Sequence, residues 1–263
     1  MPAGDTDSVE LWYVAERLAD AAREETLRHF RARHLTVESK GEHFDPVTIA
    51  DRNAESAMRT ILGELRPEDG ILGEEFEPKL GASGLTWVLD PIDGTRGFIS
   101  GTPTWGVLIA LADDDGPILG LIDQPYIGER FMGGRGRAVL EGPHGSRPLN
   151  ASGTTSLAEA TLFTTFPEVG TFAEAAAFRR VSDEAKLTRY GCDCYAYALL
   201  AAGQIDLVIE AGLNAYDIQA PIAVIEAAGG IVSDWEGKPA CDGGRALAAA
   251  TPDLHEAAME LLG

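Results

Sequence analysis

Two aspartates, Asp90 and Asp93, follow the apolar run "TWVL" in the segment "DPIDGT". Pro91 between them and Gly94 after them restrict the chain, so both carboxylates leave one rigid corner. Like charges this close raise each other's pKa unless a cation neutralises them. Hard cations such as Mg²⁺ prefer oxygen ligands, and the carbonyl of Ile92 adds another. The corner is therefore a predicted site for a divalent cation.

A phosphate-binding segment is expected directly after this corner. Gly94 and Thr95 precede a predicted short helix from Arg96 to Ser100, whose first N–H groups have no partner within the helix. Such N–H groups bind phosphate. Metal ligands beside a phosphate site predict metal-assisted phosphoryl transfer, which makes a histidine or cysteine nucleophile unnecessary.

Further carboxylates stand at the ends of predicted elements. Asp51 lies near the start of a helix, Glu74 and Glu75 follow "ILG", and Asp217 opens a helix that has Pro221 in its first turn. Each has a structural alternative. Asp217 would serve as an N-cap, Asp51 as a first-turn acid favoured by the helix dipole, and the paired glutamates as a solvated turn.

The helices and strands that carry Asp51, Glu74, Asp90 and Asp93 are expected before residue 150. A helix is expected over 8–33 with Ser8 as its cap, and a second helix over about 49–65. The first helix shows apolar residues at helical spacing, namely Leu11, Val14, Ala15, Leu18, Ala22 and Leu27. A strand in "GILG" follows, and residues 85–149 contain short apolar runs between Gly, Pro and Asp turns, which is typical of an antiparallel sheet.

The second part of the chain alternates strands and helices. Strands are predicted in "ATLFTT", "LTRY", "IDLVIE" and "GIVSD", and helices over about 171–183, 193–202, 217–229 and 252–262. This alternation indicates a layered α/β arrangement. We expect an α+β half over 1–150 and an α/β half over 151–263, joined as one unit.

Composition narrows the function classes. A net charge of −21 and a pI of about 4.5 argue against a nucleic-acid partner, which needs a basic surface. No apolar run is long enough to span a bilayer, and no secretion signal is expected. Three cysteines indicate a reducing cytoplasm rather than a disulfide framework, and without a second pair nearby they do not predict a metal site.

The motifs together resemble the inositol monophosphatase superfamily, whose members are Mg²⁺-dependent, lithium-sensitive phosphomonoesterases. The resemblance rests on "GEE" (73–75), "DPIDGT" (90–95), and Asp217 opening a helix that ends in "EAAGG". "DPVTIAD" (45–51) is similar to the segment before the family's base-side aspartate. The motifs occur in the family's order from about residue 10 onward. The resemblance implies a layered αβαβα sandwich of the inositol monophosphatase/fructose-1,6-bisphosphatase type, a cytoplasmic homodimer, and a small phosphate ester as substrate.

The resemblance also implies roles for single residues. One ion would be held by Glu74, Asp90 and the Ile92 carbonyl, and a second by Asp90, Asp93 and Asp217. Asp51 would pair with Thr95 and, with Glu74, position the attacking water, while the amides of Gly94 and Thr95 would hold the phosphate. Two or three Mg²⁺ ions are expected, with Mn²⁺ as a substitute and Li⁺ as an inhibitor.

Three positions within the family's pattern bear on the substrate. Arg96 stands in "TRGFISG" where "TTNF" is common, Asp193 ends "GCD" where inositol-hydrolysing members carry Gly-Thr-Ala, and Glu210 is kept in "DLVIEAG". These segments are similar to the histidinol-phosphate phosphatases of the superfamily, enzymes of histidine biosynthesis. Asp193 and Glu210 would accept hydrogen bonds from the ammonium and imidazole groups of histidinol.

Several alternatives stay open at this point. Asp193 would merely cap the helix that follows it. The substrate would be inositol 1-phosphate or a broad set of small phosphate esters, hydrolysed by the same mechanism. A catalytically inactive, cation-binding scaffold is the alternative outside enzymes.

Overall fold

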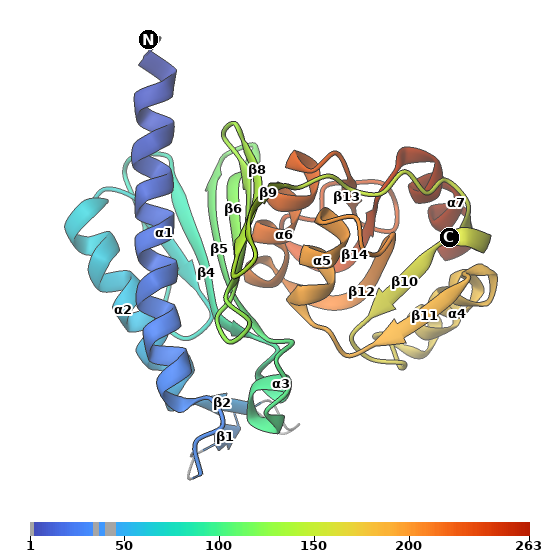
Figure 1. The fold of residues 1–263 in the computed structure, drawn as a ribbon, viewed down its shortest axis with the longest axis horizontal. Coiled ribbons are helices and arrows are strands. Elements are labelled where there is room, and N and C mark those ends of the chain that lie inside the picture. Colours follow the sequence, from blue (N-terminus) through green and yellow to red (C-terminus); the bar gives the residue numbers. More distant parts are fainter. Residues whose placement is uncertain (1–2, 34–36, 40–45) are drawn as a thin grey trace.

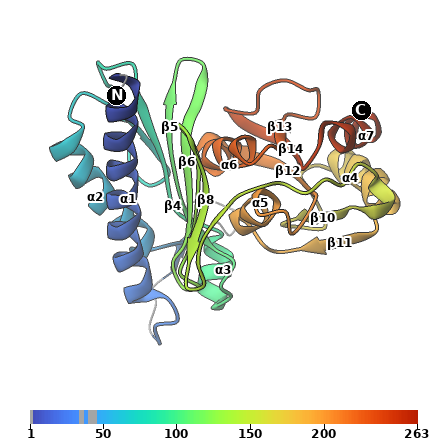
Figure 2. The same cartoon turned by 45° about the horizontal axis from the view of Figure 1, so that its top comes forward.

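The computed structural model describes residues 3–33, 37–39 and 46–263. Two helices, a seven-stranded sheet, a second helix pair, a five-stranded sheet and an outer helix pair follow one another as layers (Figure 1). This order confirms the predicted αβαβα sandwich. Figure 2 shows the middle helices between the two sheets from a second direction.

The first layer consists of α1 (Ala3–His29) and α2 (Ile49–Leu65), which pack on the first sheet. The predicted bounds of α2 are confirmed. In α1 the expected apolar stripe is buried, except that Leu27 is 39% exposed. At about 100° per residue Leu27 points about 160° away from Leu11, on the opposite side of the helix. The predicted cap is wrong, because α1 begins before Ser8, whose hydroxyl donates to the Arg135 carbonyl oxygen at 2.9 Å.

The first sheet contains seven strands in sequence order. They are β3 (Gly70–Gly73), β4 (Thr86–Asp93), β5 (Gly106–Asp113), β6 (Gly116–Gln124), β7 (Glu129–Gly134), β8 (Arg137–Gly142) and β9 (Gly145–Pro148). β3 and β4 are parallel, and every later neighbouring pair is antiparallel, as predicted for residues 85–149. The exposed edge strand β9 was not predicted.

The second sheet has the order β11-β10-β12-β14-β13. Its strands are β10 (Thr161–Thr164), β11 (Leu187–Tyr190), β12 (Leu207–Asn214), β13 (Ile231–Ser233) and β14 (Gly243–Ala249). β10 is parallel to β11 and β12, whereas β14 is antiparallel to both of its neighbours. β14 was not predicted. A separate short hairpin pairs β1 (Val37–Ser39) with β2 (Pro46–Thr48).

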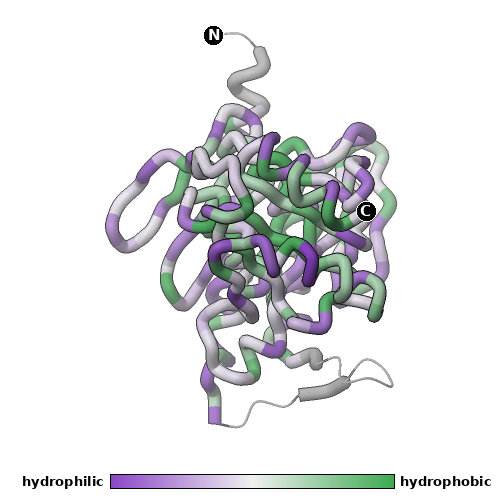
Figure 3. The backbone as a smooth tube through the Cα atoms, turned by 90° about the vertical axis from the view of Figure 1, so that its right-hand side faces the viewer, coloured by the Kyte–Doolittle hydropathy of each residue, from purple (hydrophilic) through white to green (hydrophobic). Residues whose placement is uncertain are grey.

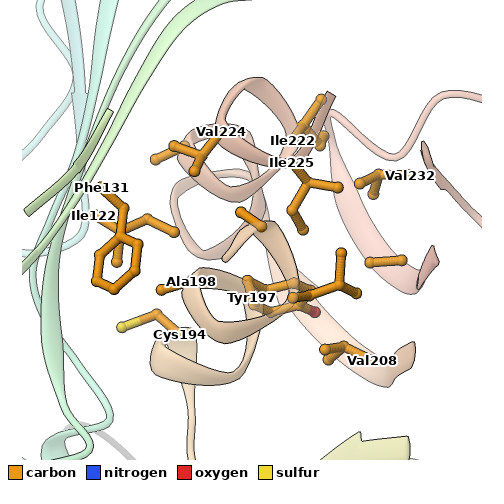
Figure 4. Close-up of a cluster of buried hydrophobic side chains, with 14 of the residues drawn as sticks. Ile122, Phe131, Cys194, Tyr197, Ala198, Val208, Ile222, Val224, Ile225 and Val232 are labelled. Atoms are coloured by element: carbon orange, nitrogen blue, oxygen red, sulfur yellow. The ribbon is translucent and has the colours of Figure 1, made fainter. Parts of the chain in front are cut away.

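Helices α5 (Cys194–Ala201) and α6 (Ala215–Ala227) fill the space between the sheets. Ile122 and Phe131 of the first sheet face Ala198 and Val224 of these helices, and Val208 lies on the second sheet (Figure 4). The most hydrophobic stretches of the backbone run through the middle of the molecule (Figure 3). The core therefore extends through both sheets.

The remaining helices are α3 (Thr95–Ser100), the 3-10 turn η1 (Leu157–Glu159), and the outer pair α4 (Phe172–Glu184) and α7 (Pro252–Leu262). The predicted helices over 171–183 and 252–262 are thus confirmed. The boundary near residue 150 stays a prediction. Among the described residues, no helix combines the length and apolar character needed to cross a bilayer.

Candidate active site

The corner at the end of β4 has the irregular backbone that its sequence predicts. The pairing of β4 with β5 shifts register between Asp90 and Asp93, where Pro91 and Ile92 intervene. The Ile92 N–H donates to Asp90 Oδ1 at 3.0 Å, so the turn is closed by its own first carboxylate. Asp90 is only 2% exposed.

The pairing of β3 with β4 places Glu74 next to this corner. Gly73 of β3 pairs with Leu89 of β4, and the next N–H, that of Glu74, donates to the Leu89 carbonyl oxygen at 3.2 Å. Glu74 therefore continues the parallel ladder beside Asp90. Among the neighbouring charges, the negative charge of Glu74 raises the pKa of Asp90 the most.

Asp217 reaches the same place from the first turn of α6. Asn214 is the N-cap and its backbone N–H donates to Asp217 Oδ2 at 2.7 Å, as in a capping box. The prediction that Asp217 opens or caps the helix is therefore wrong by a few residues. Pro221 correspondingly lies inside the helix rather than in its first turn.

Oxygen atoms of Asp90, Asp93 and Asp217 lie within 4.8 Å of one another. Burial, followed by the charges of Glu74, Asp93 and Asp217, raises the pKa of Asp90 well above its ordinary value. Burial, followed by Asp193 and Asp217, does the same for Asp93. A cluster of hard oxygen donors whose mutual repulsion needs a positive charge fits a divalent cation.

Asp51 and Thr95 approach the corner from α2 and α3. Asp51 Oδ2 accepts hydrogen bonds from the N–H and hydroxyl of Thr48, at 2.9 and 2.6 Å, in the capping box that begins α2. Asp51 Oδ1 lies 3.5 Å from the Thr95 hydroxyl oxygen, which is also 3.2 Å from the Ile92 carbonyl oxygen. Residue Asp45 of the "DPVTIAD" segment lies outside the described residues.

Asp193 packs on the predicted phosphate-binding segment. Gly94 has a φ of 84°, and a Cβ atom added to it would lie 2.8 Å from Asp193 Cγ. Asp193 occupies the N-cap position of α5, yet its side chain makes no capping hydrogen bond, so the capping alternative is wrong. The Cys194 N–H in the first turn of α5 donates instead to Asp93 Oδ2 at 2.6 Å. Asp93 therefore caps α5 from the other part of the chain.

Two adjoining cavities open at these residues. The first, of about 270 Å³, is lined by Glu74, Gly94, Thr95 and Arg96. The second, of about 180 Å³, extends to Glu210. Asp93, Phe166, Asp193, Gly212 and Asp217 line both cavities.

The second cavity is acidic, and the protein fixes its Glu210 carboxylate by hydrogen bonds. Glu210 is 7% exposed and accepts hydrogen bonds from the Thr165 N–H at 2.6 Å and the Thr165 hydroxyl at 2.8 Å. Burial nevertheless raises the pKa of Glu210 to about 7. Burial raises the pKa of Asp193 to about 6, against the opposing charge of Arg96.

Phe166 and Tyr197 are among the cavity-lining residues that were not predicted. Phe166, 43% exposed, borders both cavities, and the guanidinium of Arg96 stacks over its ring at 5.0 Å. Tyr197 lines the second cavity, and its buried hydroxyl has no hydrogen-bond partner among the described residues. The only sequence signal for Phe166 is an aromatic residue in a proline-containing turn, and Tyr197 looks like an ordinary helical core residue.

The sequence-predicted residues thus fall into three groups. The first group forms the end of β4 and its surroundings, called here the acidic corner: Glu74, Asp90, Ile92, Asp93 and Asp217. Gly94, Thr95 and Arg96 line the first cavity, with Asp51 behind Thr95. Asp193 borders both cavities, whereas Glu210 lines the second.

Comparison with known proteins identifies the family. The family profile described as "Inositol monophosphatase family" matches residues 7–263. The chain belongs to the inositol monophosphatase family. Members are metal-dependent phosphoric monoester hydrolases, and this protein is accordingly such a hydrolase.

Individual relatives differ in their names within this family. The chain is 42% identical to the bifunctional phosphatase IMPL2 of Arabidopsis thaliana, over 98% of this chain and 76% of the relative. It is 36% identical to the histidinol-phosphatase of Mycobacterium tuberculosis, over 89% of this chain and 91% of the relative. The solved structure of an inositol monophosphatase from Zymomonas mobilis matches with a TM-score of 0.85 and 39% identity, over 100% of this chain and 99% of that chain.

Proposed function

We propose that the protein hydrolyses L-histidinol phosphate to L-histidinol and phosphate with Mg²⁺ as its metal. The observation that carries this proposal is the second cavity, in which Asp193 and Glu210 lie next to the acidic corner. Histidinol carries an ammonium group and an imidazole, and carboxylates form charge-assisted hydrogen bonds with such cations. An inositol ring is uncharged and gains less from two carboxylates. Histidinol-phosphatases among the relatives support the same substrate.

The acidic corner provides the proposed metal ligands. Glu74, Asp90 and the Ile92 carbonyl would hold one ion, and Asp90, Asp93 and Asp217 a second, with two or three Mg²⁺ ions in all and Mn²⁺ as a substitute. Bound cations would lower the pKa of coordinated water and offset the charge that develops on the leaving oxygen.

The chain's own groups would bind phosphate and move a proton. The N–H groups of Gly94 and Thr95 hold the phosphate oxygens at the start of α3, and Glu74 orients the attacking water. A proton of this water passes to Asp51 Oδ1 through the Thr95 hydroxyl, whose oxygen lies 3.5 Å from Asp51 Oδ1. The new P–O bond forms as the bond to the leaving alcohol breaks, and the leaving oxygen takes up a proton from solvent.

The leaving group would occupy the second cavity. Asp193 and Glu210 accept hydrogen bonds from its ammonium and imidazole, and Arg96 attracts the phosphate at the rim of the first cavity. Phe166 lies where the two cavities meet, and its ring offers a face to the imidazole. A cavity of about 180 Å³ suits a leaving group smaller than a drug-sized ligand.

The test is a substrate comparison with the purified protein and Mg²⁺. We expect kcat/KM for histidinol phosphate to exceed that for inositol 1-phosphate by about 100-fold, the difference that one or two charge-assisted hydrogen bonds supply. Equal values, or turnover of inositol 1-phosphate alone, would replace this proposal by the inositol or broad-specificity alternative. Inhibition by Li⁺ is expected in either case.

We further propose a cytoplasmic homodimer whose two halves, 1–150 and 151–263, unfold as one unit. The three cysteines are unpaired, which supports a reducing compartment, and the core that α5 and α6 share with both sheets supports joint unfolding. Light scattering during size-exclusion chromatography tests the dimer, and a single calorimetric transition tests the joint unfolding.

A further inference from the structure

One face of α2 holds the turn that follows β3. Arg52, Glu55 and Arg59 are spaced so that they share this face. Arg52 Nε lies 3.9 Å from Glu75 Oε2, and an Arg59 guanidinium nitrogen donates to the Phe76 carbonyl oxygen at 3.0 Å. Glu55, between the two arginines, accepts a hydrogen bond from the Glu75 N–H at 2.7 Å. The helix therefore fixes the backbone immediately after Glu74.

Glu55 is a buried carboxylate with both oxygens in use. Its side chain is 0% exposed, and Arg59 Nε donates to Oε1 at 2.7 Å while the Glu75 N–H donates to Oε2. The arginine offsets the cost of burying the charge. The second hydrogen bond is not needed for that neutralisation. It joins the carboxylate to the backbone of the turn.

The glycine of the "GEE" segment is explained by the same carboxylate. A Cβ atom added to Gly73 would lie 2.0 Å from Glu55 Oε1, so Glu55 occupies the space that a side chain would take. The φ of Gly73 is not positive, so close approach rather than backbone conformation requires glycine here. The buried position of the Glu55 carboxylate therefore requires glycine at position 73.

We propose that Glu55 is a positioning residue of the active site, which fixes Glu74 as a ligand for a divalent cation. This inference rests on the proposed function, in which Glu74 binds metal. Glu74 is held on one side by the sheet, because its N–H donates to the Leu89 carbonyl oxygen, and on the other by the bond from Glu75 to Glu55. A ligand held on both sides loses little conformational freedom when a cation binds.

The test is titration of the chelator-treated full chain with Mn²⁺ by calorimetry. Glu55→Gln keeps the size of the side chain, but its amide nitrogen must face either Arg59 or the Glu75 N–H, both of which are donors. We expect the dissociation constant for Mn²⁺ to rise about 10- to 100-fold, as for other residues that orient metal ligands. The Mg²⁺ concentration for half-maximal activity should rise likewise, while kcat at saturating Mg²⁺ recovers to within about threefold of the wild-type value.

Asp69→Asn is the matched control, at the opposite end of β3 from Glu74. Asp69 is 1% exposed and pairs with Arg66 at 2.8 Å, so its loss also breaks a buried ion pair. We expect lower stability with unchanged Mn²⁺ affinity. Should Glu55→Gln not fold, Arg59→Gln keeps the carboxylate but removes its cation, and a smaller rise in the dissociation constant is expected.

Two outcomes would overturn the inference alone. One is a folded Glu55→Gln protein that binds Mn²⁺ within about twofold of the wild type or, should that variant not fold, an Arg59→Gln protein that does so. The other is an equal loss of affinity in Asp69→Asn, which would make the effect one of general stability. A wild-type protein that binds no Mn²⁺ would instead overturn the proposed function, and this inference with it.

Discussion

Asp93 Oδ2 accepts a 2.6 Å hydrogen bond from the backbone N–H of Cys194, a residue 101 positions later in the chain. The same carboxylate belongs to the acidic corner formed with Asp90 and Asp217. Asp93 thus ends a strand of the first sheet and caps a helix that lies between the two sheets. The positive end of that helix partly offsets the negative charge of the corner.

The first prediction concerns this double role. Asp93→Asn keeps an oxygen that accepts from Cys194, so we expect the fold to persist. The substitution removes a proposed ligand, and kcat/KM should fall by at least about 100-fold, since even residues that only orient ligands cost 10- to 100-fold. Phosphate release and circular dichroism are the measurements.

The same variant should be more stable than the wild type when metal is withheld, because one of several repelling carboxylates has become neutral. Thermal melts in a chelator and in Mg²⁺ should therefore rank the two proteins in opposite orders. A wild-type rate of phosphate release would contradict the metal assignment.

The second prediction uses the contact of Gly94 with Asp193. Gly94→Ala places a methyl group 2.8 Å from Asp193 Cγ and forces alanine into a φ of 84°. We expect a stability loss of about 2–4 kcal/mol, from a positive φ and an overpacked contact together, and severe loss of activity as the proposed phosphate-binding turn shifts. Urea unfolding and kcat/KM measure the two effects.

Gly84→Ala is the control for that experiment. Gly84 has a φ of 81° with no atom within 4 Å of an added Cβ, so this variant carries the backbone cost without the collision. The free energy of unfolding of Gly84→Ala should fall by about 1 kcal/mol, and its kcat/KM should stay unchanged. Equal losses in the two variants would mean that the Asp193 contact does not matter.

The third prediction concerns selection of the leaving group by Asp193. Asp193→Asn removes the charge but keeps nearly the same side-chain size and shape, so the unusual backbone of this residue (φ 46°, ψ −141°) carries a side chain like the original one. For histidinol phosphate we expect kcat/KM to fall about 10- to 100-fold, the value of a hydrogen bond to a charged group. For inositol 1-phosphate it should change less than about threefold. A parallel fall for both substrates would assign Asp193 to the site's structure instead of its selectivity.

The fourth prediction concerns the pH dependence of stability. Burial raises the pKa of Glu210 from 4.5 to about 7, so the folded protein holds this proton more tightly than the unfolded chain does. The contribution to the free energy of unfolding is complete below about pH 4.5, falls as the pH rises, and is lost above about pH 7. The pKa shift changes the free energy of unfolding by at most about 3.5 kcal/mol, from about 1.4 kcal/mol for each pKa unit.

Glu210→Gln cannot ionise and should not show this loss. Urea unfolding of the chelator-treated proteins at about pH 5 and about pH 8 should find the variant gaining stability relative to the wild type as the pH rises. Parallel changes in the two proteins would show that Glu210 has an ordinary pKa in the folded state.

The fold was most predictable where apolar residues repeat at the spacing of a helix or strand and a capping or turn residue marks where that element begins or ends. Helix α2 has its predicted bounds because Thr48 caps it and its apolar face repeats regularly. Strand β14 escaped prediction because "GGRALAA" begins with two glycines at positive φ and continues with small residues that show no alternation. Its position between β12 and β13 is decided by tertiary pairing.

The site residues were predictable where several of them are adjacent in the sequence. They were not predictable where a single residue reaches the site only through tertiary packing. "DPIDGT" is recognisable because its turn chemistry and its carboxylates occupy one segment. Phe166 and Glu55 are ordinary residue types in ordinary elements, and only the packing of distant segments brings them to the cavities or to Gly73. Asp51 and Asp217 were found as carboxylates, but their shared place in capping boxes required the actual helix starts.

The origin of the acidic corner in two distant segments has a consequence for incomplete chains. A fragment that ends before Asp217 still contains "GEE" and "DPIDGT", and a motif search would count it as a phosphatase. It would lack the third carboxylate of the cluster and the helix start that delivers it. During synthesis the candidate active site is therefore completed only after Asp217 has been added and α6 has packed against β4.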